Sequence, residues 1–83
     1  MSKIELVEVL GPGCPRCQQA HRVVQHVVEE SGLDVEVRKV EGIDRMIELG
    51  ILATPAIAID GQVKVAGQVP ETAMVRRLLG LEA

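Results

Sequence analysis

Three features are missing from this chain of 83 residues, and each absence excludes a class of protein. The chain contains no Phe, Tyr or Trp, so the bases of single-stranded nucleic acid would find no aromatic ring to stack on. Lys and Arg number 9 against 12 Asp and Glu, a net charge of −3, whereas a nucleic-acid-binding surface is usually basic. No run of about 18 apolar residues is present. We therefore expect neither nucleic acid nor a membrane as a partner.

The residues that are present fit a small globular domain. The composition is 47% hydrophobic and 25% charged, which is typical of a folded chain, and the length favours one domain over residues 1–83. Glu5 stands where a secretory signal would need an unbroken apolar stretch, so we expect a cytoplasmic protein. We also expect the protein to act as a monomer. In that compartment a pair of cysteines is more often catalytic, redox-sensing or metal-binding than a permanent crosslink.

The hydrophobic pattern predicts seven secondary-structure elements in the order βαβαββα. The first β-α-β unit is expected to join parallel strands, and Asp60-Gly61 predicts a two-residue hairpin between the last two strands. Pro15 and Pro70 are placed in the first turns of the first and last helices. The predicted strands cover residues 4–10, 34–40, 55–59 and 62–66, and the predicted helices cover about 15–30, 43–49 and 70–79.

Helical spacing gives each helix an apolar side. In the first helix this side includes Val24 and Val28. The second predicted helix is short, and its apolar side consists of Ile43, Met46 and Ile47.

Two cysteines flank the start of the first helix, in the motif Cys14-Pro15-Arg16-Cys17. The first turn of a helix has unpaired N–H groups and the positive end of the helix dipole, and both stabilise a thiolate at Cys14. Pro15 and Arg16 are predicted to tune the thiols, Arg16 through its positive charge. Helical geometry places Cys17 at the edge of the apolar stripe and Cys14 toward its polar flank. We therefore expect an exposed Cys14 that attacks a target disulfide and a more buried Cys17 that releases the product.

Two other interpretations of the cysteine pair stay open. Both residues could be small apolar core residues, although that role gives no reason for a proline between them at a helix start. Cys14, Cys17, His21 and His26 could form a metal site, but all four lie on one predicted helix without the loop of a zinc finger. His26 falls on the solvent face and cannot complete a tetrahedron, whereas His21 lies one turn beyond Cys17 and could touch its sulfur.

The chain resembles the thioredoxin/glutaredoxin superfamily, and most closely its short thioredoxin-like members, the small redox-active disulfide proteins. The resemblance covers nearly the whole chain. It implies a minimal thioredoxin-like α/β fold, with a four-stranded mixed sheet in the order 2-1-3-4 flanked by three helices. The segments that carry it are Gly11-Pro12-Gly13-Cys14-Pro15-Arg16-Cys17, Ala53-Thr54-Pro55-Ala56, and Asp60-Gly61 with Gly67 beyond it.

The resemblance also implies roles for residues outside the motif. In the superfamily the threonine–proline bond is cis and faces the thiols, so the Thr54–Pro55 bond is expected to be cis, with Thr54, Pro55 and Gly67 binding an extended substrate segment. Glu8 stands at the offset of a buried acid that accepts the proton of the resolving thiol in thioredoxins. Here it is either buried and able to take that proton, or a solvated acid at the strand. The tryptophan found beside the thiols of thioredoxins is replaced by Gly13.

These observations predict a thiol–disulfide oxidoreductase that reduces protein disulfides through the Cys14–Cys17 dithiol. No bound cofactor and no metal are expected. Protein disulfides are the expected substrates, and a flavoprotein reductase is the expected electron donor. The alternatives are a small metal-binding module of the metallochaperone type, which would use the same cysteines, and a redox sensor dedicated to one partner.

Overall fold

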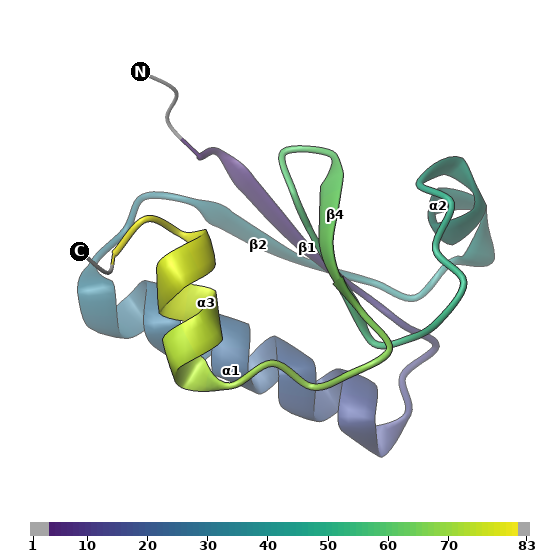
Figure 1. Cartoon of the computed structure of the whole chain (residues 1–83), viewed down its shortest axis with the longest axis horizontal. Helices are drawn as coiled ribbons and strands as arrows, with labels where there is room; N and C mark the ends of the chain where they lie inside the picture. The colour runs from purple at the N-terminus through teal and green to yellow at the C-terminus, as the bar shows by residue number, and fades with distance from the viewer. Residues whose placement is uncertain (1–3, 82–83) are drawn as a thin grey trace.

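The computed structural model describes residues 4–81 and contains the seven elements in the predicted order (Figure 1). No helix in this part of the chain is long and apolar enough to cross a membrane. The strands are β1 (Leu6–Leu10), β2 (Glu36–Val40), β3 (Ala56–Ile59) and β4 (Gln62–Ala66), and the helices are α1 (Pro15–Ser31), α2 (Ile43–Glu48) and α3 (Thr72–Leu78).

The four strands form one mixed sheet in the order β2-β1-β3-β4, which confirms the expected topology. β1 pairs in parallel with β2, and β3 pairs antiparallel with both β1 and β4. Asp60 and Gly61 form the turn between β3 and β4 with φ angles of 49° and 85°, the positive values that a two-residue hairpin turn requires. The Asp60 carboxylate also accepts hydrogen bonds from the N–H groups of Glu5 and Leu6, at 3.1 and 3.0 Å, so the hairpin is tied to the start of β1.

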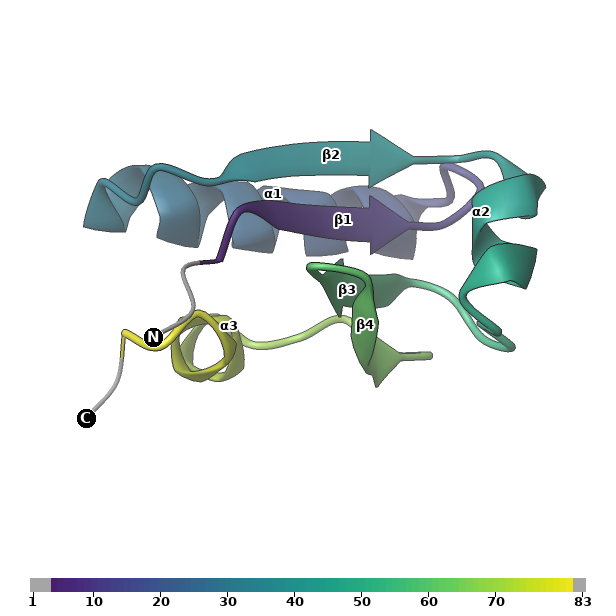
Figure 2. The ribbon, with the colours of Figure 1, turned by 90° about the horizontal axis from the view of Figure 1, so that it is seen from above.

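Alternate side chains of the central strands divide the core into two parts, one on each face of the sheet. Val7 and Val9 belong to the larger cluster, with residues of α1 and α3, while Leu10 belongs to a smaller cluster with Met46 of α2. Helices α1 and α3 contact each other, with α3 in front of α1 in Figure 1, and Figure 2 shows α2 alone at the end of the sheet where β1 and β2 finish. Helix α1 begins at this same end.

The ends of several elements differ from the prediction. β1 and β2 begin two residues later than predicted and β3 one residue later. The sequence pattern includes residues that precede the first hydrogen-bonded pair of neighbouring strands, which for β1 and β2 is Leu6 with Glu36. Helix α1 ends at Ser31, followed by Gly32 in the left-handed conformation, as its sequence indicated. Helix α3 begins at Thr72 rather than at Pro70, since Glu71 is extended and precedes the helix as its N-cap. Pro70 is buried ahead of the helix instead of opening it.

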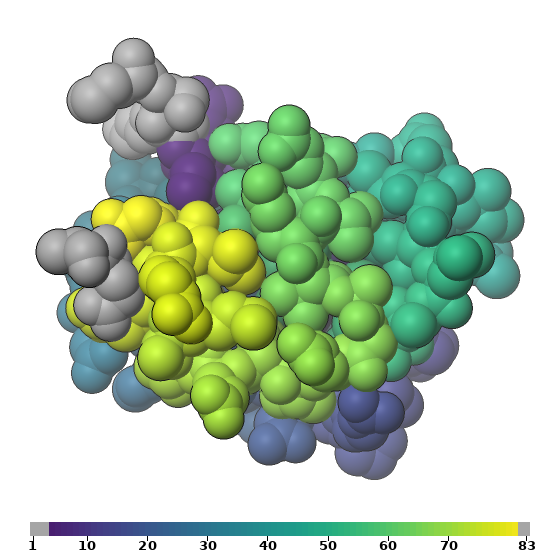
Figure 3. All heavy atoms as spheres, in the orientation of Figure 1, coloured from purple at the N-terminus to yellow at the C-terminus, as the bar shows by residue number. Residues whose placement is uncertain are grey.

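Helix α2 buries a different side from the predicted one. Of its three apolar residues only Met46 is buried, while Ile43 and Ile47 are 67% and 69% exposed. The sheet beneath α2 carries Glu8, which is buried and bonded to Arg45 of the helix. Helix α2 therefore turns Arg45 and Met46 toward the sheet, and the isoleucines face away from it. In the space-filling view of Figure 3, the teal atoms of α2 stand out at one edge of the molecule.

Candidate functional site

The two cysteines lie where β1 passes into α1, at the right-hand end of the sheet in Figure 2. Cys14 is the N-cap residue of α1, and its Sγ accepts a hydrogen bond from the backbone N–H of Cys17 at 3.4 Å. The two Sγ atoms are 2.7 Å apart, and both cysteines are free thiols. The i, i+3 spacing on a helix therefore places the two sulfurs within reach of each other, as the motif predicted.

The two thiols have opposite environments. Cys17 is 3% exposed, whereas Cys14 is partly exposed. The pKa of Cys14 is lowered most by the hydrogen bond from the Cys17 side chain and next by the hydrogen bond from the Cys17 backbone N–H. The pKa of Cys17 is raised most by burial of its side chain and next by the hydrogen bond with the Cys14 side chain. The thiolate is thus favoured on the accessible sulfur and the proton on the buried one.

Gly11 determines how close Cys17 can lie to the end of β1. A Cβ atom on Gly11 would overlap Cys17 Sγ and would lie 2.9 Å from Cys17 Cβ. Gly11 is buried, and its N–H donates to the carbonyl of Val40 at 2.9 Å, so the backbone is held in place. The Gly-Pro-Gly sequence indicated only a loop. The contact with Cys17 depends on how α1 folds back against β1, and no local pattern reveals it.

The Thr54–Pro55 segment approaches the cysteines from the start of β3. Its peptide bond is cis. A Cβ atom on Gly11 would lie 3.7 Å from Thr54 Cβ, so Thr54 and Cys17 both border Gly11. Pro55 is buried, and its carbonyl accepts a hydrogen bond from the N–H of Gly67 at 2.9 Å. The structure therefore places Thr54, Pro55 and Gly67 together, close to the cysteine motif.

Arg16 connects the cysteine motif to the loop after β4. Its Nη2 donates to the carbonyl of Gly67 at 3.1 Å, and a Cβ atom on Gly67 would lie 3.1 Å from the Cβ of Ala53. Two loops that are far apart in the sequence, those of Ala53 and Gly67, thus meet beside the motif. Arg16 lowers the pKa of Cys14 through its backbone N–H, while its guanidinium bonds to Gly67. Pro15 is the first residue of α1, as predicted.

Glu8 is buried, so its interpretation as a solvated acid is wrong. Its side chain is 3% exposed, and its two oxygens accept hydrogen bonds from Nε and Nη2 of Arg45 at 2.9 and 2.8 Å. These bonds to Glu8, together with one to Glu48, raise the pKa of Arg45. The hydrogen bonds described for the Glu8 side chain both go to Arg45 and none goes to a cysteine. Arg45 lies 37 residues from Glu8 in the sequence, and no local signal predicts this pair.

The residues of the alternative metal site do not come together. His26 lies on the exposed side of α1, with Nε2 3.9 Å from an oxygen of Glu30. His21 is partly buried one turn beyond Cys17 on the same helix. Within residues 4–81, no group of three His, Cys, Asp or Glu side chains is arranged to hold a metal ion. The described geometry therefore offers the two sulfurs without a third ligand.

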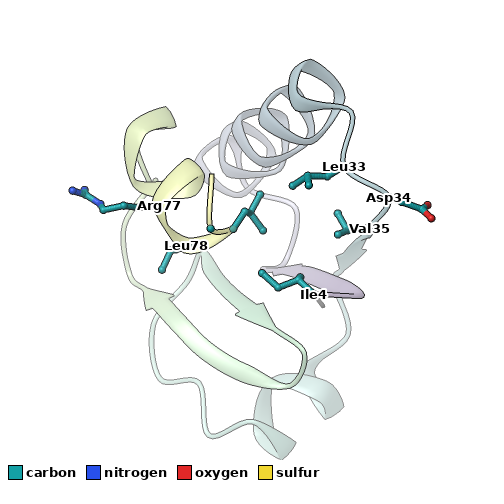
Figure 4. Close-up of a pocket in the computed structure, with 8 residues that line it drawn as sticks. Ile4, Leu33, Asp34, Val35, Arg77 and Leu78 are labelled. Carbon is teal, nitrogen blue, oxygen red and sulfur yellow. The ribbon is translucent and has the colours of Figure 1, made fainter. Parts of the chain in front are cut away.

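A hollow of about 380 Å³ lies away from the thiols (Figure 4). It is formed where β1 and β2 begin and where α3 ends, at the opposite end of the sheet from the cysteines. No residue of the cysteine motif or of the loops beside it takes part in its lining, so it is separate from the thiol site. Its labelled lining residues are Ile4, Leu33, Asp34, Val35, Arg77 and Leu78.

Known proteins are similar to this chain in sequence and in fold. Residues 5–80 match the Thioredoxin domain family. A thioredoxin of Methanothermobacter thermautotrophicus is 32% identical over 73 residues, which cover 88% of this chain and 95% of the relative. A thioredoxin of Methanocaldococcus jannaschii is 36% identical over 81 residues, which cover 94% and 95%. The solution structure of reduced MJ0307 is similar with a TM-score of 0.57 and 35% identity, over 96% of this chain and 98% of that one.

Proposed function

This chain belongs to the thioredoxin domain family and is a thiol–disulfide oxidoreductase, and we propose that Cys14 is its nucleophile and Cys17 its resolving thiol. One observation carries the assignment. Within a single close pair, the pKa of the accessible thiol is lowered and the pKa of the buried thiol is raised. Because the thiolate is the attacking species, this asymmetry gives the first step to Cys14.

In the proposed cycle, the Cys14 thiolate attacks one sulfur of a target disulfide. A bond forms between Cys14 and that sulfur while the target disulfide breaks, and the second target sulfur leaves as a thiolate that takes up a proton. Cys17 then loses its proton and attacks Cys14 Sγ. This step forms the Cys14–Cys17 disulfide and releases the first target sulfur as a thiolate. Two electrons have passed to the target, and a reductase partner must return them.

We propose that Thr54, Pro55 and Gly67 bind the target segment that carries the disulfide. Their position supports this role, because Thr54 borders Gly11 together with the resolving cysteine and Gly67 accepts a hydrogen bond from Arg16 of the motif. With no aromatic ring in the chain, recognition at this point depends on backbone groups and small side chains.

Glu8 supports the site indirectly in this proposal. Its two hydrogen bonds to Arg45 hold α2 against the sheet, which favours an anchoring role over the acceptance of a proton from Cys17. Pro15 orders the first turn of α1, and Arg16 holds the loop after β4 beside that turn.

Disulfides are the substrates and a reductase is the partner, as in the thioredoxin family. We propose further that this reductase is a flavoprotein, because a flavin can pass on the two electrons that a disulfide takes up. We also propose that the protein works as a monomer in the cytoplasm, where thiols are kept reduced.

The proposed roles are tested by comparing the wild type with Cys14→Ser and Cys17→Ser on a protein disulfide. The wild type should reduce the disulfide, and Cys14→Ser should be inactive. Cys17→Ser should accumulate one mixed disulfide per chain, joined through Cys14, because the second step is blocked. Mass spectrometry of the trapped species identifies the joined cysteine. A mixed disulfide that forms as rapidly through Cys17 in Cys14→Ser would overturn the assignment.

A further inference from the structure

Three exposed aliphatic side chains lie in one short segment between β2 and the Thr54–Pro55 bond. Ile43 and Ile47 are 67% and 69% exposed, and Leu52 is 98% exposed. We call Ile43, Ile47 and Leu52 the α2 patch. The fourth large hydrophobic residue that is exposed within residues 4–81 is Val63 on β4, at 37%. Isolated exposed aliphatic residues are common, but a group of them is typical of an interaction surface.

The outward orientation of the two isoleucines follows from how α2 is anchored. Arg45 is held by both oxygens of Glu8, and Met46 packs in the core beside it. At about 100° per residue, both isoleucines point about 110–150° away from the midpoint between Arg45 and Met46. Turning α2 to bury them would remove Arg45 from Glu8 and leave a buried carboxylate without its partner, which is strongly unfavourable. The fold therefore holds the isoleucines at the surface.

The segment after α2 folds back onto the end of the helix. The N–H groups of Gly50 and Ile51 donate to the carbonyls of Ile47 and Met46, at 3.0 and 2.9 Å. Leu52 follows directly and is almost fully exposed. Leu52 thus follows directly on backbone that is bonded to α2, and the teal atoms of this stretch form one edge of the molecule in Figure 3.

The α2 patch lies at the same end of the sheet as the thiol site, and Glu41, just before α2, borders the cysteine motif, since its Oε2 would lie 3.1 Å from a Cβ atom on Gly13. Ala53 comes directly after Leu52 and packs against Gly67, whose carbonyl accepts the hydrogen bond from Arg16 of the cysteine motif. Figure 2 shows α2 at the same end of the sheet as the start of α1. A protein whose disulfide reaches Cys14 can therefore extend onto this patch.

Acidic residues surround the patch. Glu41, Asp44 and Glu48 are exposed. Glu41 is paired with Lys39 at 3.5 Å, and Glu48 is paired with Arg45 at 2.8 Å. Arg45 is the one basic residue of residues 41–52, and it is shared between Glu48 and the buried Glu8. Three acids and one base give this segment a charge of −2. Its electrostatic complement is a basic surface.

We propose that the α2 patch docks a protein substrate that presents an apolar projection, flanked by lysine or arginine, next to its disulfide. The inference rests on the proposed function, in which Cys14 attacks that disulfide. The size of the patch favours this occupant over a second copy of the chain. A stable interface buries about 800 Å² per partner, more than three side chains supply, whereas the brief encounters of redox partners use smaller contacts.

The test uses three disulfide probes and measures kcat/KM for each. Two are disulfide-bridged peptides of equal length with an apolar arm, flanked by lysine in one and by glutamate in the other. The third is dithiobisnitrobenzoate, a disulfide too small to reach α2 from Cys14. The variants are Ile43→Ser/Ile47→Ser and the matched control Val63→Ser, which removes an exposed aliphatic side chain on β4.

We expect the wild type to prefer the lysine-flanked peptide, and added salt to weaken that preference. Ile43→Ser/Ile47→Ser should lower kcat/KM on this peptide about tenfold and leave the small disulfide within about twofold. Val63→Ser should change neither value by more than about twofold.

Three outcomes would overturn the proposal. An unchanged kcat/KM on the lysine-flanked peptide removes the patch from substrate binding, and equal losses on peptide and small disulfide show damage to the thiol site instead. A wild-type dimer in sedimentation that becomes a monomer in the double variant assigns the patch to self-association. If Cys14 were not the nucleophile, Cys14→Ser would still reduce the small disulfide. This result distinguishes a failure of the proposed function from a failure of the α2 patch as a docking site.

Discussion

Removing Arg45 should destabilise this protein far more than removing Arg38, although both arginines are paired with a glutamate of the sheet. Each has its Nη2 2.8 Å from a glutamate oxygen. The side chain of Glu8, the partner of Arg45, is 3% exposed, whereas that of Glu36, the partner of Arg38, is 59% exposed. A buried carboxylate that loses its partner costs about 3–5 kcal/mol, and an exposed ion pair contributes about 0.2–1 kcal/mol.

These values can be compared with the stability of the whole chain. At about 0.05–0.15 kcal/mol per residue, 83 residues give a free energy of unfolding of about 4–12 kcal/mol. Arg45→Met therefore removes a large share of the stability, and Arg38→Met a small one. Urea unfolding followed by circular dichroism measures both changes.

A double variant keeps this prediction testable if Arg45→Met does not fold. Glu8→Met/Arg45→Met leaves no stranded charge, and apolar replacement of a buried ion pair is often neutral or stabilising, so it should recover most of the lost stability. Two results would show that the loss of Arg45 leaves no costly buried charge at Glu8. One is that Arg45→Met lowers the free energy of unfolding no more than Arg38→Met, and the other is that the double variant is no more stable than Arg45→Met.

Two further predictions concern the loops beside the thiols. Gly11→Ala should displace Cys17 Sγ and weaken its hydrogen bond to Cys14, so that the pKa of Cys14 rises toward its ordinary value in a thiolate absorbance titration. Gly42→Ala, where no atom lies within 4 Å of the new Cβ, should leave the titration unchanged, and an unchanged titration in Gly11→Ala would refute the packing of Cys17 against Gly11. Arg16→Gln should leave the pKa of Cys14 unchanged, because the guanidinium bonds to the loop after β4, and should lower kcat/KM on protein disulfides about two- to threefold. A raised pKa of Cys14 in Arg16→Gln would instead assign that guanidinium the electrostatic role predicted from the sequence.

Features that depend on neighbouring residues were predictable from the sequence. The hairpin at Asp60-Gly61 depends on two adjacent residues that accept positive φ, and β4 has the bounds that its pattern predicted. The closeness of the two thiols and the deeper burial of Cys17 follow from an i, i+3 spacing at a helix start. The order of the strands came from the family resemblance, since periodicity alone does not say which strands are neighbours.

Features that depend on contacts between distant residues were not predictable in this way. The apolar spacing of α2 suggested that Ile43 and Ile47 would be buried with Met46, but a charge buried on the neighbouring strand determines which side of α2 faces the sheet. That charge, Glu8, bonds to Arg45 across 37 residues of sequence. Hydrophobic periodicity carries no information about such a pair.

Measuring the alkylation rate of each thiol against pH shows whether Cys14 is the thiolate and Cys17 holds the proton. The reduced protein is treated with iodoacetamide, and each cysteine is quantified by peptide mass spectrometry. The pKa of Cys14 is lowered and that of Cys17 is raised, so thiolate forms on Cys14 at the lower pH. Cys14 should react faster than Cys17 at every pH below about 7 and should reach its half-maximal rate at the lower pH. Faster labelling of Cys17, or equal rates and midpoints for the two cysteines, would show that Cys14 is not the favoured thiolate.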